Sequence, residues 1–196
     1  MNTDKTLTTI VDFYCFGSMK NLILFTIVLC TFEFNTMVLF DFTPESDLSR
    51  WYVVDDGVMG GLSQGNFGLD DEGHAIFRGT VSLENNGGFS SIRYRSGTVD
   101  VSAYEKVVLR LKGDGKKYQF RMKSSRYDRH SYIQYFETNG EWQTIEIPLS
   151  DLYPTFRGRT LRMSNYPGEI VEEIAFLIGN KKAENFNLVI DKIELE

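Results

Sequence analysis

The sequence contains little cysteine and little histidine. Its 196 residues include only two cysteines and two histidines, and both cysteines, Cys15 and Cys30, fall within the first thirty positions. The rest of the chain therefore has no disulfide and no cysteine metal site. His74 and His130 each stand alone, which excludes a histidine-based metal cluster. We expect neither a metal nor another cofactor.

The charge pattern argues against nucleic acid as a ligand. The formal net charge is −6, the pI is about 5.1, and no extended basic stripe is visible. Proteins that bind nucleic acid set clustered Lys and Arg against the phosphates. The partner is therefore expected to be something other than nucleic acid.

The sequence also lacks an apolar run of the roughly 20 residues that a membrane-spanning helix needs. Its longest run is KNLILFTIVLCTF at residues 20–32. Starting at Met19, this segment has the short basic start and apolar stretch of a signal peptide, although no A-x-A cleavage pattern follows. An uncleaved anchor that contacts the membrane and a structured segment are the alternatives.

Length allows one domain and a leader. We expect residues 1–37 to form the leader and residues 38–196 to form a single domain. A globular part of about 150 residues buries roughly 70% of its unfolded surface, enough for an independent core. If Met19 starts a signal peptide, the protein is exported, periplasmic or membrane-associated; otherwise it is cytoplasmic.

Glycine and aromatic residues are abundant. The chain has 17 Gly, 15 Phe and 10 Tyr, which is typical of β structure with many tight turns. Short strand-like segments alternate with glycine turns and predict an all-β fold, a two-sheet jelly-roll β-sandwich without long helices. Outside two predicted hairpins, the expected strands cover residues 38–42, 51–54, 74–81, 89–95, 173–179 and 186–195.

A first β-hairpin is predicted in VVLRLKGDGKKYQFRM, residues 107–122. If Asp114 and Gly115 form a two-residue turn, Leu111 lies opposite Tyr118 and all three apolar pairs share one face. Turn and hydrophobic pattern then indicate the same register.

A second hairpin is predicted across Asn139-Gly140, joining residues 132–137 to residues 142–148. A two-residue loop places Ile145 opposite Gln134. A three-residue loop places Ile145 opposite Tyr135, which packs better, and we favour this register.

Several motifs resemble one known family. In chain order they are LFDF, W-x-x-x-DDGVMGGLS, FRGTVSLENNGGFSSIR, LRLKGDGKKYQFRM, YIQYF, W-x-x-IEIPLSDL and FRGR, of which DDGVMGGLS and ENNGGFSS are the most specific. From residue 38 to residue 196 the chain resembles the complex I intermediate-associated proteins, assembly factors of NADH:ubiquinone oxidoreductase. The resemblance implies a galactose-binding-like jelly roll, a role in assembly, and no enzymatic activity.

Asp55 and Asp56 form the obvious carboxylate pair. They suit a cation or a ligand hydroxyl, or they bond the free N–H groups of the glycine turn that follows them. Adjacent side chains in an extended segment point to opposite faces, so Asp55 and Asp56 are poorly placed to act together as a general acid and a general base. The candidate binding residues of this turn are Asp55, Asp56, Met59, Gly60 and Gly61.

Arginines supply the second set of candidates. Arg93, Arg95, Arg110 and Arg121 lie opposite the apolar face of their strands, so neighbouring strands would display a row of guanidinium groups. Such a row suits an acidic peptide, a carboxylate or a sugar, and an ordinary solvated face is the alternative. Arg157 and Arg159, in the FRGR motif on an expected loop, are further candidates for binding.

The other glycine-rich motifs are interpreted as turns. Gly87, Gly88, Gly113, Asp114 and Gly115 are expected to shape backbone between strands. The GDGK segment lacks the spacing of a phosphate-binding loop, and GVMGG does not match a dinucleotide fingerprint.

Two functions are compatible with these residues and motifs. The first is a non-catalytic, chaperone-like assembly factor that binds partner proteins, including respiratory complex subunits. The alternative is a carbohydrate- or small-ligand-binding module of an exported protein. Nothing in the sequence supports an enzyme.

Overall fold

The computed structural model describes residues 35–196, except for the side chains of Val58 and Met59. The predicted leader from Met19 and both cysteines lie outside the described residues, so those predictions stay open. Among the described residues, no helix is both long enough and apolar enough to cross a bilayer.

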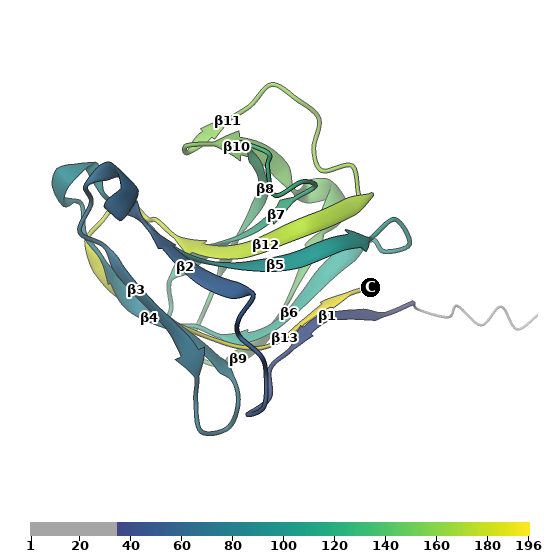
Figure 1. Ribbon diagram of the computed structural model, residues 1–196, viewed down its shortest axis with the longest axis horizontal. Coiled ribbons are helices and arrows are strands. Elements are labelled where there is room, and N and C mark those ends of the chain that lie inside the picture. Colours follow the sequence, from purple (N-terminus) through teal and green to yellow (C-terminus); the bar gives the residue numbers. More distant parts are fainter. Residues whose placement is uncertain (1–34) are drawn as a thin grey trace, which may run out of the picture. The chain divides into compact units, whose positions relative to one another are not determined.

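The described chain folds into two antiparallel sheets packed face to face (Figure 1). Sheet A has the order β3–β4–β13–β6–β9, with β1 also paired to β13. Its strands are β1 (Met37–Asp41), β3 (Gln64–Leu69), β4 (Ala75–Val81), β6 (Lys106–Lys112), β9 (Trp142–Pro148) and β13 (Glu184–Leu195).

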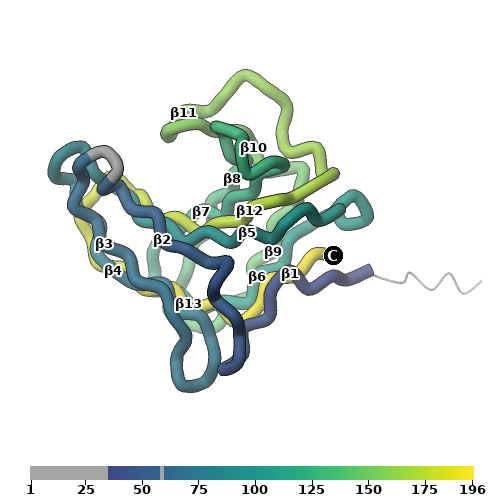
Figure 2. The backbone as a smooth tube through the Cα atoms, viewed as in Figure 1, coloured from purple at the N-terminus to yellow at the C-terminus, as the bar shows by residue number. Residues whose placement is uncertain are grey.

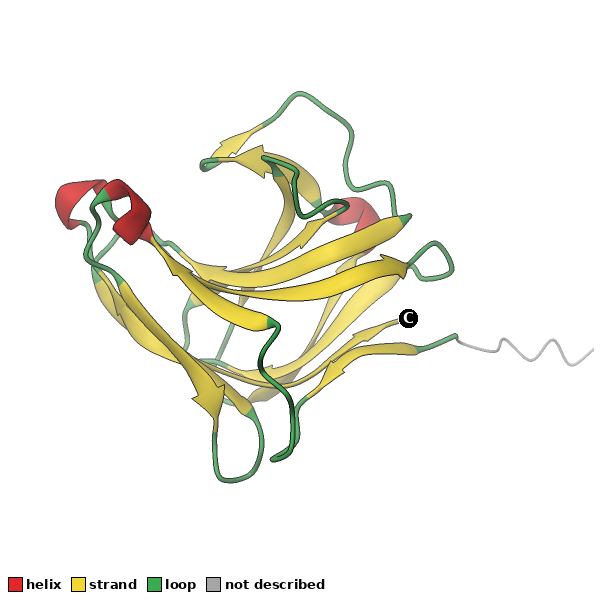
Figure 3. Ribbon diagram, viewed as in Figure 1, coloured by secondary structure: helices red, strands yellow, loops and turns green. Residues whose placement is uncertain are grey.

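Sheet B has the order β11–β10–β8–β7–β12–β5–β2. Its strands are β2 (Trp51–Asp55), β5 (Ser90–Asp100), β7 (Lys117–Lys123), β8 (Ser131–Glu137), β10 (Tyr153–Phe156), β11 (Arg159–Thr160) and β12 (Ile170–Ile178). Between the strands, the described helical segments are short 3-10 turns: η1 (Asp56–Met59), η2 (Glu84–Asn86) and η3 (Leu149–Asp151) (Figure 3). The predicted all-β, jelly-roll-like sandwich is confirmed.

The core forms because alternate residues of each strand are apolar and face the opposing sheet. In sheet B, Phe120 of β7 lies opposite Phe176 of β12, and both side chains are fully buried. Burial of one such side chain stabilises the fold by about 1.5–3 kcal/mol. The intervening residues Arg121 and Ala175, paired with each other, point the other way and line the outer face of sheet B.

An aromatic cluster closes one part of the sandwich. The Trp51 ring stacks on Tyr94 at a centroid distance of 4.8 Å, and Phe40 and Phe67 pack against Trp51 at 5.4 and 5.2 Å. These rings come from β1, β2, β3 and β5, so the cluster joins the two sheets. Trp51 is 6% exposed. We therefore assign it to the packing between the two sheets.

The predicted hairpin around Asp114 is wrong. β6 pairs with β9 and β13 in sheet A, whereas β7 pairs with β8 and β12 in sheet B. Leu111 and Tyr118 therefore lie in different sheets, and the loop between them crosses the sandwich (Figure 2). Alternation of apolar and polar residues shows only that one face of a strand is buried. Two consecutive strands can share that pattern whether they pair in one sheet or face each other from opposite sheets.

The predicted hairpin across Asn139-Gly140 is wrong for the same reason. β8 belongs to sheet B and β9 to sheet A. Ile145 lies opposite Leu109 of β6, and Tyr135 lies opposite Gln119 of β7. Both of the registers weighed for this hairpin are therefore incorrect.

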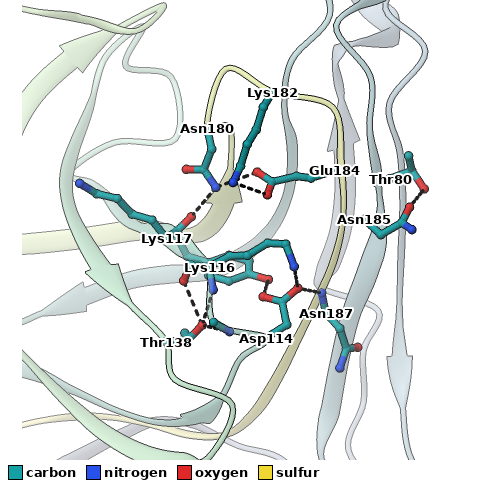
Figure 4. Close-up of polar contacts among 12 residues, drawn as sticks. Thr80, Asp114, Lys116, Lys117, Thr138, Asn180, Lys182, Glu184, Asn185 and Asn187 are labelled. Atoms are coloured by element: carbon teal, nitrogen blue, oxygen red, sulfur yellow. Dashed lines mark hydrogen bonds and ion pairs between the residues drawn. The ribbon is translucent and has the colours of Figure 1, made fainter.

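The crossing loops hold one another in place (Figure 4). The Thr138 hydroxyl accepts hydrogen bonds from the N–H groups of Gly115 and Lys116 at 3.1 and 3.0 Å, and it donates to the Lys116 carbonyl at 2.9 Å. A Cβ atom on Gly113 would lie 2.4 Å from the Thr138 side chain, so glycine permits this close approach. The Asp114 carboxylate accepts from the Tyr118 hydroxyl and from the Asn187 N–H, each at 2.9 Å.

The strands β3, β10 and β11 were not expected from the sequence. β3 contains Gly65, Asn66 and Gly68, which are poor strand formers. β10 contains Pro154, which cannot donate to the ladder. Tertiary pairing with β4 and β8 overrides these weak local preferences.

Candidate functional site

The outer face of sheet B, the face turned away from sheet A, gathers charged residues that lie far apart in the sequence. Arg93 of β5 and Arg121 of β7 both pair with Ala175 of β12, one on each side. Across the three strands β5, β12 and β7, Ala175 therefore lies between the two arginines. β12 lies between β7 and β5 (Figure 1). This order brings Arg93 and Arg121 to the same part of the face.

Glu173 lies at the centre of this charged group. Its carboxylate is 3.3 Å from Arg93 Nη1 and 3.7 Å from Lys123 Nζ, and its side chain is 6% exposed. The Tyr52 hydroxyl donates a 2.7 Å hydrogen bond to the same carboxylate. Burial is the main cause of the raised Tyr52 pKa, and this bond raises it further. We call Arg93, Arg121, Lys123 and Glu173 the Glu173 cluster.

The Glu173 cluster has more positive than negative charge. Within residues 35–196, Arg121 makes no ion pair; it donates a 2.7 Å bond to the neutral Gln119 amide oxygen. Burial, and then repulsion from Arg93, lower the pKa of Arg121 to about 10, so it stays cationic at neutral pH. Burial also lowers the pKa of Lys123, against the attraction of Glu173.

A pocket of about 460 Å³ adjoins the Glu173 cluster. Arg50, Arg95 and Arg126 line it, together with Glu172 and the exposed Tyr127. Arg95 also lies 4.7 Å above the ring of Tyr52, which bonds Glu173, so the pocket and the cluster are neighbours on this face. We call this space the arginine pocket.

The predicted arginine row is correct for sheet B and wrong for Arg110. Arg93, Arg95 and Arg121 share the outer face of sheet B. Arg110 belongs to β6 of sheet A, where its guanidinium lies 5.3 Å from the ring centre of Trp142. The error follows from the hairpin prediction, which had placed β6 beside β7.

Asp55 and Asp56 are used by the protein's own backbone and hydroxyl groups. Asp55 accepts from the Ser90 hydroxyl at 2.5 Å and from the Gly65 N–H at 2.9 Å. Asp56 is fully buried, and it accepts from the hydroxyl and N–H of Ser63 and from the N–H groups of Gly88 and Phe89. A ligand at either carboxylate would have to displace these bonds.

The hydrogen bonds determine the charge state of Asp56. Burial alone would raise its pKa, but the bonds from Ser63, Gly88 and Phe89 outweigh burial and hold the pKa below its usual value. Asp56 is therefore an anion held by donors inside the protein.

Two of the three predicted glycine turns, those of Gly60-Gly61 and Gly87-Gly88, surround Asp56. Gly60 ends η1 with φ of +87°, and Gly88 has φ of +137°. A Cβ atom on Gly61 or Gly87 would lie 2.2 or 2.7 Å from the Asp56 carboxylate. The Met59 side chain lies outside the described part, so its predicted binding role is untested.

Arg157 and Arg159 lie on the β10–β11 hairpin, and both are exposed. Arg157 has φ of +50°, and its guanidinium lies 5.4 Å from the ring of Phe156. Three strands, β10, β8 and β7, separate β11 from β12. The sheet therefore does not place these arginines in the Glu173 cluster, and their binding role stays a prediction.

Tyr52, Lys123 and Glu173 were not among the residues predicted from the sequence. One signal was present: Glu173 interrupts the apolar segment IVEEIAFLI of β12. A carboxylate in a central strand requires paired charges or hydrogen bonds when it is buried. Its partners could not be found from the sequence, because they come from β2, β5 and β7.

Comparison with known proteins agrees with the motifs found in the sequence. The model of the family Complex I intermediate-associated protein 30 (CIA30) matches residues 40–190. The mitochondrial Complex I intermediate-associated protein 30 of Drosophila melanogaster is 28% identical over 187 aligned residues, which cover 83% of this chain and 63% of that protein. The mouse protein, from Mus musculus, is 24% identical, over 80% of this chain and 55% of its own length.

A solved structure shares the fold. The Family 11 carbohydrate-binding module of the cellulosomal cellulase Lic26A-Cel5E of Clostridium thermocellum superposes with a TM-score of 0.60, over 82% of this chain and 94% of that module. At 19% identity this likeness establishes the sandwich fold alone. The chain spans about 55–63% of the length of the two curated relatives, and by its match over residues 40–190 it belongs to the CIA30 family.

Proposed function

We propose that this protein is a non-catalytic assembly factor that binds partner proteins, among them subunits of respiratory complex I, through the outer face of sheet B. Membership of the CIA30 family supports the role, since its relatives are named for their association with complex I intermediates. The excess positive charge of the Glu173 cluster and the arginine pocket supports the location, because the chain as a whole has a net charge of −6.

The architecture suits a holding surface. Six strands of sheet B, all but β11, are hydrogen-bonded side by side over at least three residues per pair, so the backbone that carries the outer-face side chains is held in a fixed arrangement. Side chains that are already ordered lose little further freedom on binding, which favours affinity. Tyr127, at the edge of the arginine pocket, is 77% exposed and offers an aromatic contact.

Disruption of the gene tests the role. We expect less assembled NADH:ubiquinone oxidoreductase on native gels of the source organism's membranes, with partial assemblies accumulating, and restoration by the wild-type gene. The tagged protein should also capture complex I subunits from a strain in which assembly is stalled. A normal amount of assembled complex in the disrupted strain would refute the proposal.

A carbohydrate-binding module is the second candidate, because Tyr52, Tyr135 and Tyr153 lie on the outer face of sheet B beside polar groups. Sugars bind well to an uncovered aromatic face. Here Arg95 lies 4.7 Å above the ring of Tyr52, and Lys117 lies 4.6 Å above the ring of Tyr135. These cations compete with a sugar for the ring faces, which favours the first proposal.

Affinity electrophoresis separates the two candidates. Migration of the protein should be unchanged in gels that contain soluble β-glucans or agarose oligosaccharides. Saturable retardation that the Tyr135→Ala substitution abolishes would instead support the carbohydrate module.

A further inference from the structure

The Glu173 cluster has three cations, Arg93, Arg121 and Lys123, and one carboxylate. Arg93 and Lys123 share the single carboxylate of Glu173, while Arg121 bonds only the amide of Gln119. The Nε atom of Arg93 is buried and has no hydrogen-bond partner among the described residues. A buried N–H donor without a partner loses the bond it would make to water. The described residues thus supply fewer acceptors than this cluster has donors.

Two guanidinium groups flank Ala175 on the outer face of sheet B. The depression that Arg93, Arg121, Lys123 and Glu173 line there encloses no free volume, so a ligand would contact the partly exposed outer parts of Arg93 and Arg121. Guanidinium groups present planar pairs of N–H donors, which match the two oxygens of a carboxylate.

The arginine pocket lies next along the same face. Its 460 Å³ accommodates a side chain or two, and Arg50, Arg95 and Arg126 surround it. Glu172 is already engaged, accepting from the Arg126 N–H at 3.0 Å and from the Thr98 hydroxyl at 3.2 Å. The charge of the arginines thus exceeds that of the acid, as it does in the Glu173 cluster.

We infer that the outer face of sheet B binds an acidic segment of a partner protein, with one carboxylate on the partly exposed guanidinium groups of Arg93 and Arg121 and another in the arginine pocket. This inference rests on the proposed function and names the chemistry of the partner. A segment with Asp or Glu separated by small residues fits both positions, because Glu172 and Glu173 lie between the cations and repel a ligand with continuous negative charge.

Direct binding to a defined probe tests the inference. A short fluorescein-labelled peptide that alternates Glu and Gly is titrated with the full chain, and fluorescence anisotropy reports binding. We expect saturable binding that weakens with added salt. The matched peptide with Gln in place of Glu should not bind. Equal binding of both peptides, or no binding of either, would overturn the inference.

Matched substitutions locate the site. Arg93→Gln and Arg121→Gln should each weaken binding by about tenfold, the loss expected for one charge-assisted hydrogen bond. Arg78→Gln removes the same charge from an exposed position on β4 of sheet A and should leave binding unchanged. Equal weakening by all three variants would show that only net charge matters, and would refute the site.

A fourth variant guards against misfolding as the explanation. Glu173→Gln removes the competing carboxylate and should strengthen binding of the Glu peptide, a gain that damage to the fold would not produce. Weaker binding by a variant whose near-ultraviolet circular dichroism matches the wild type would contradict the charge argument.

Two further outcomes separate this inference from the proposed function. If polygalacturonate binds in an Arg121-dependent manner and the Glu peptide does not, the ligand is an acidic glycan and the peptide inference is wrong. If no acidic probe binds but gene disruption still reduces assembled complex I, the assembly role stands and only the acidic segment is refuted.

Discussion

The carboxylate of Asp56 accepts a 2.6 Å hydrogen bond from the N–H of Gly88, which lies 32 positions later in the chain. This bond joins the turn after β2 to the turn before β5, and those two strands pair in sheet B. Two glycine-rich motifs that look separate in the sequence are therefore one structural unit. Their shared feature is a buried anion enclosed by backbone donors.

Asp56→Asn should destabilise the domain by about 2–4 kcal/mol, because it removes a buried charge from several donors and leaves some unpaired. Urea unfolding followed by tryptophan fluorescence measures the change. Asp71→Asn, on an exposed residue of the β3–β4 loop, is the matched control and should change stability little. Equal effects of the two substitutions would contradict the role of Asp56.

The stability contributed by Asp56 should depend on pH in the acid range. Its pKa is below its usual value in the folded protein, so the contribution is complete above the unfolded pKa of about 4 and is lost as pH falls through the folded pKa. The stability difference between wild type and Asp56→Asn should therefore shrink below about pH 4. A difference that stays constant down to about pH 2 would be inconsistent with this sign.

Gly88→Ala should cost about 1–3 kcal/mol, because Gly88 has φ of +137°, where a side chain is strained. A Cβ atom there would meet Leu83 only at ordinary contact distance, so the cost arises from the backbone. Gly57→Ala is the control, since its Cβ would meet no atom within 4 Å and its φ is not positive. Thermal melts of the two variants should differ clearly, and identical melting temperatures would disprove the strain.

Thr138→Val should destabilise the domain by about 1–3 kcal/mol, because it leaves the N–H groups of Gly115 and Lys116 without their acceptor. Thr144→Val, on an exposed residue of β9, is the isosteric control. Hydrogen exchange should show faster exchange at Gly115 and Lys116 in the Thr138 variant alone. Unchanged exchange there would mean that the two crossing loops are not coupled.

Tyr118 should keep its proton under alkaline conditions until the domain unfolds. Burial, and then the charge of Asp114, raise its pKa. A raised folded pKa gives stability that is present below the unfolded value of about 10 and lost as pH rises above it. Tyr118→Phe should therefore lose less stability between about pH 9 and 11 than the wild type. Absorbance titration at alkaline pH should show the same rise in both proteins before unfolding.

Local sequence patterns were sufficient for much of the fold. The alternation in β5 and β7, the glycine turns and the DDGVMGGLS motif predicted the sandwich and the family correctly. They also identified Arg93 and Arg121 as outward-facing residues. Each of these properties depends on neighbours within a few positions along the chain.

Pairing between strands was decided only in the tertiary structure. The segments around Asp114 and Asn139 have the turn residues and apolar alternation of hairpins, yet their strands separate into different sheets. The two-residue alternation indicates which face of a strand is apolar. It does not indicate which other strand pairs with it.

The sequence by itself determined where most of the strands run, which of their faces is buried and to which family the chain belongs. The tertiary structure decided that β12 lies between β5 and β7, and hence that Glu173 meets Arg93, Lys123 and Tyr52. The physical reason is that these contacts span 50 to 121 positions in the chain, a distance over which no local propensity acts.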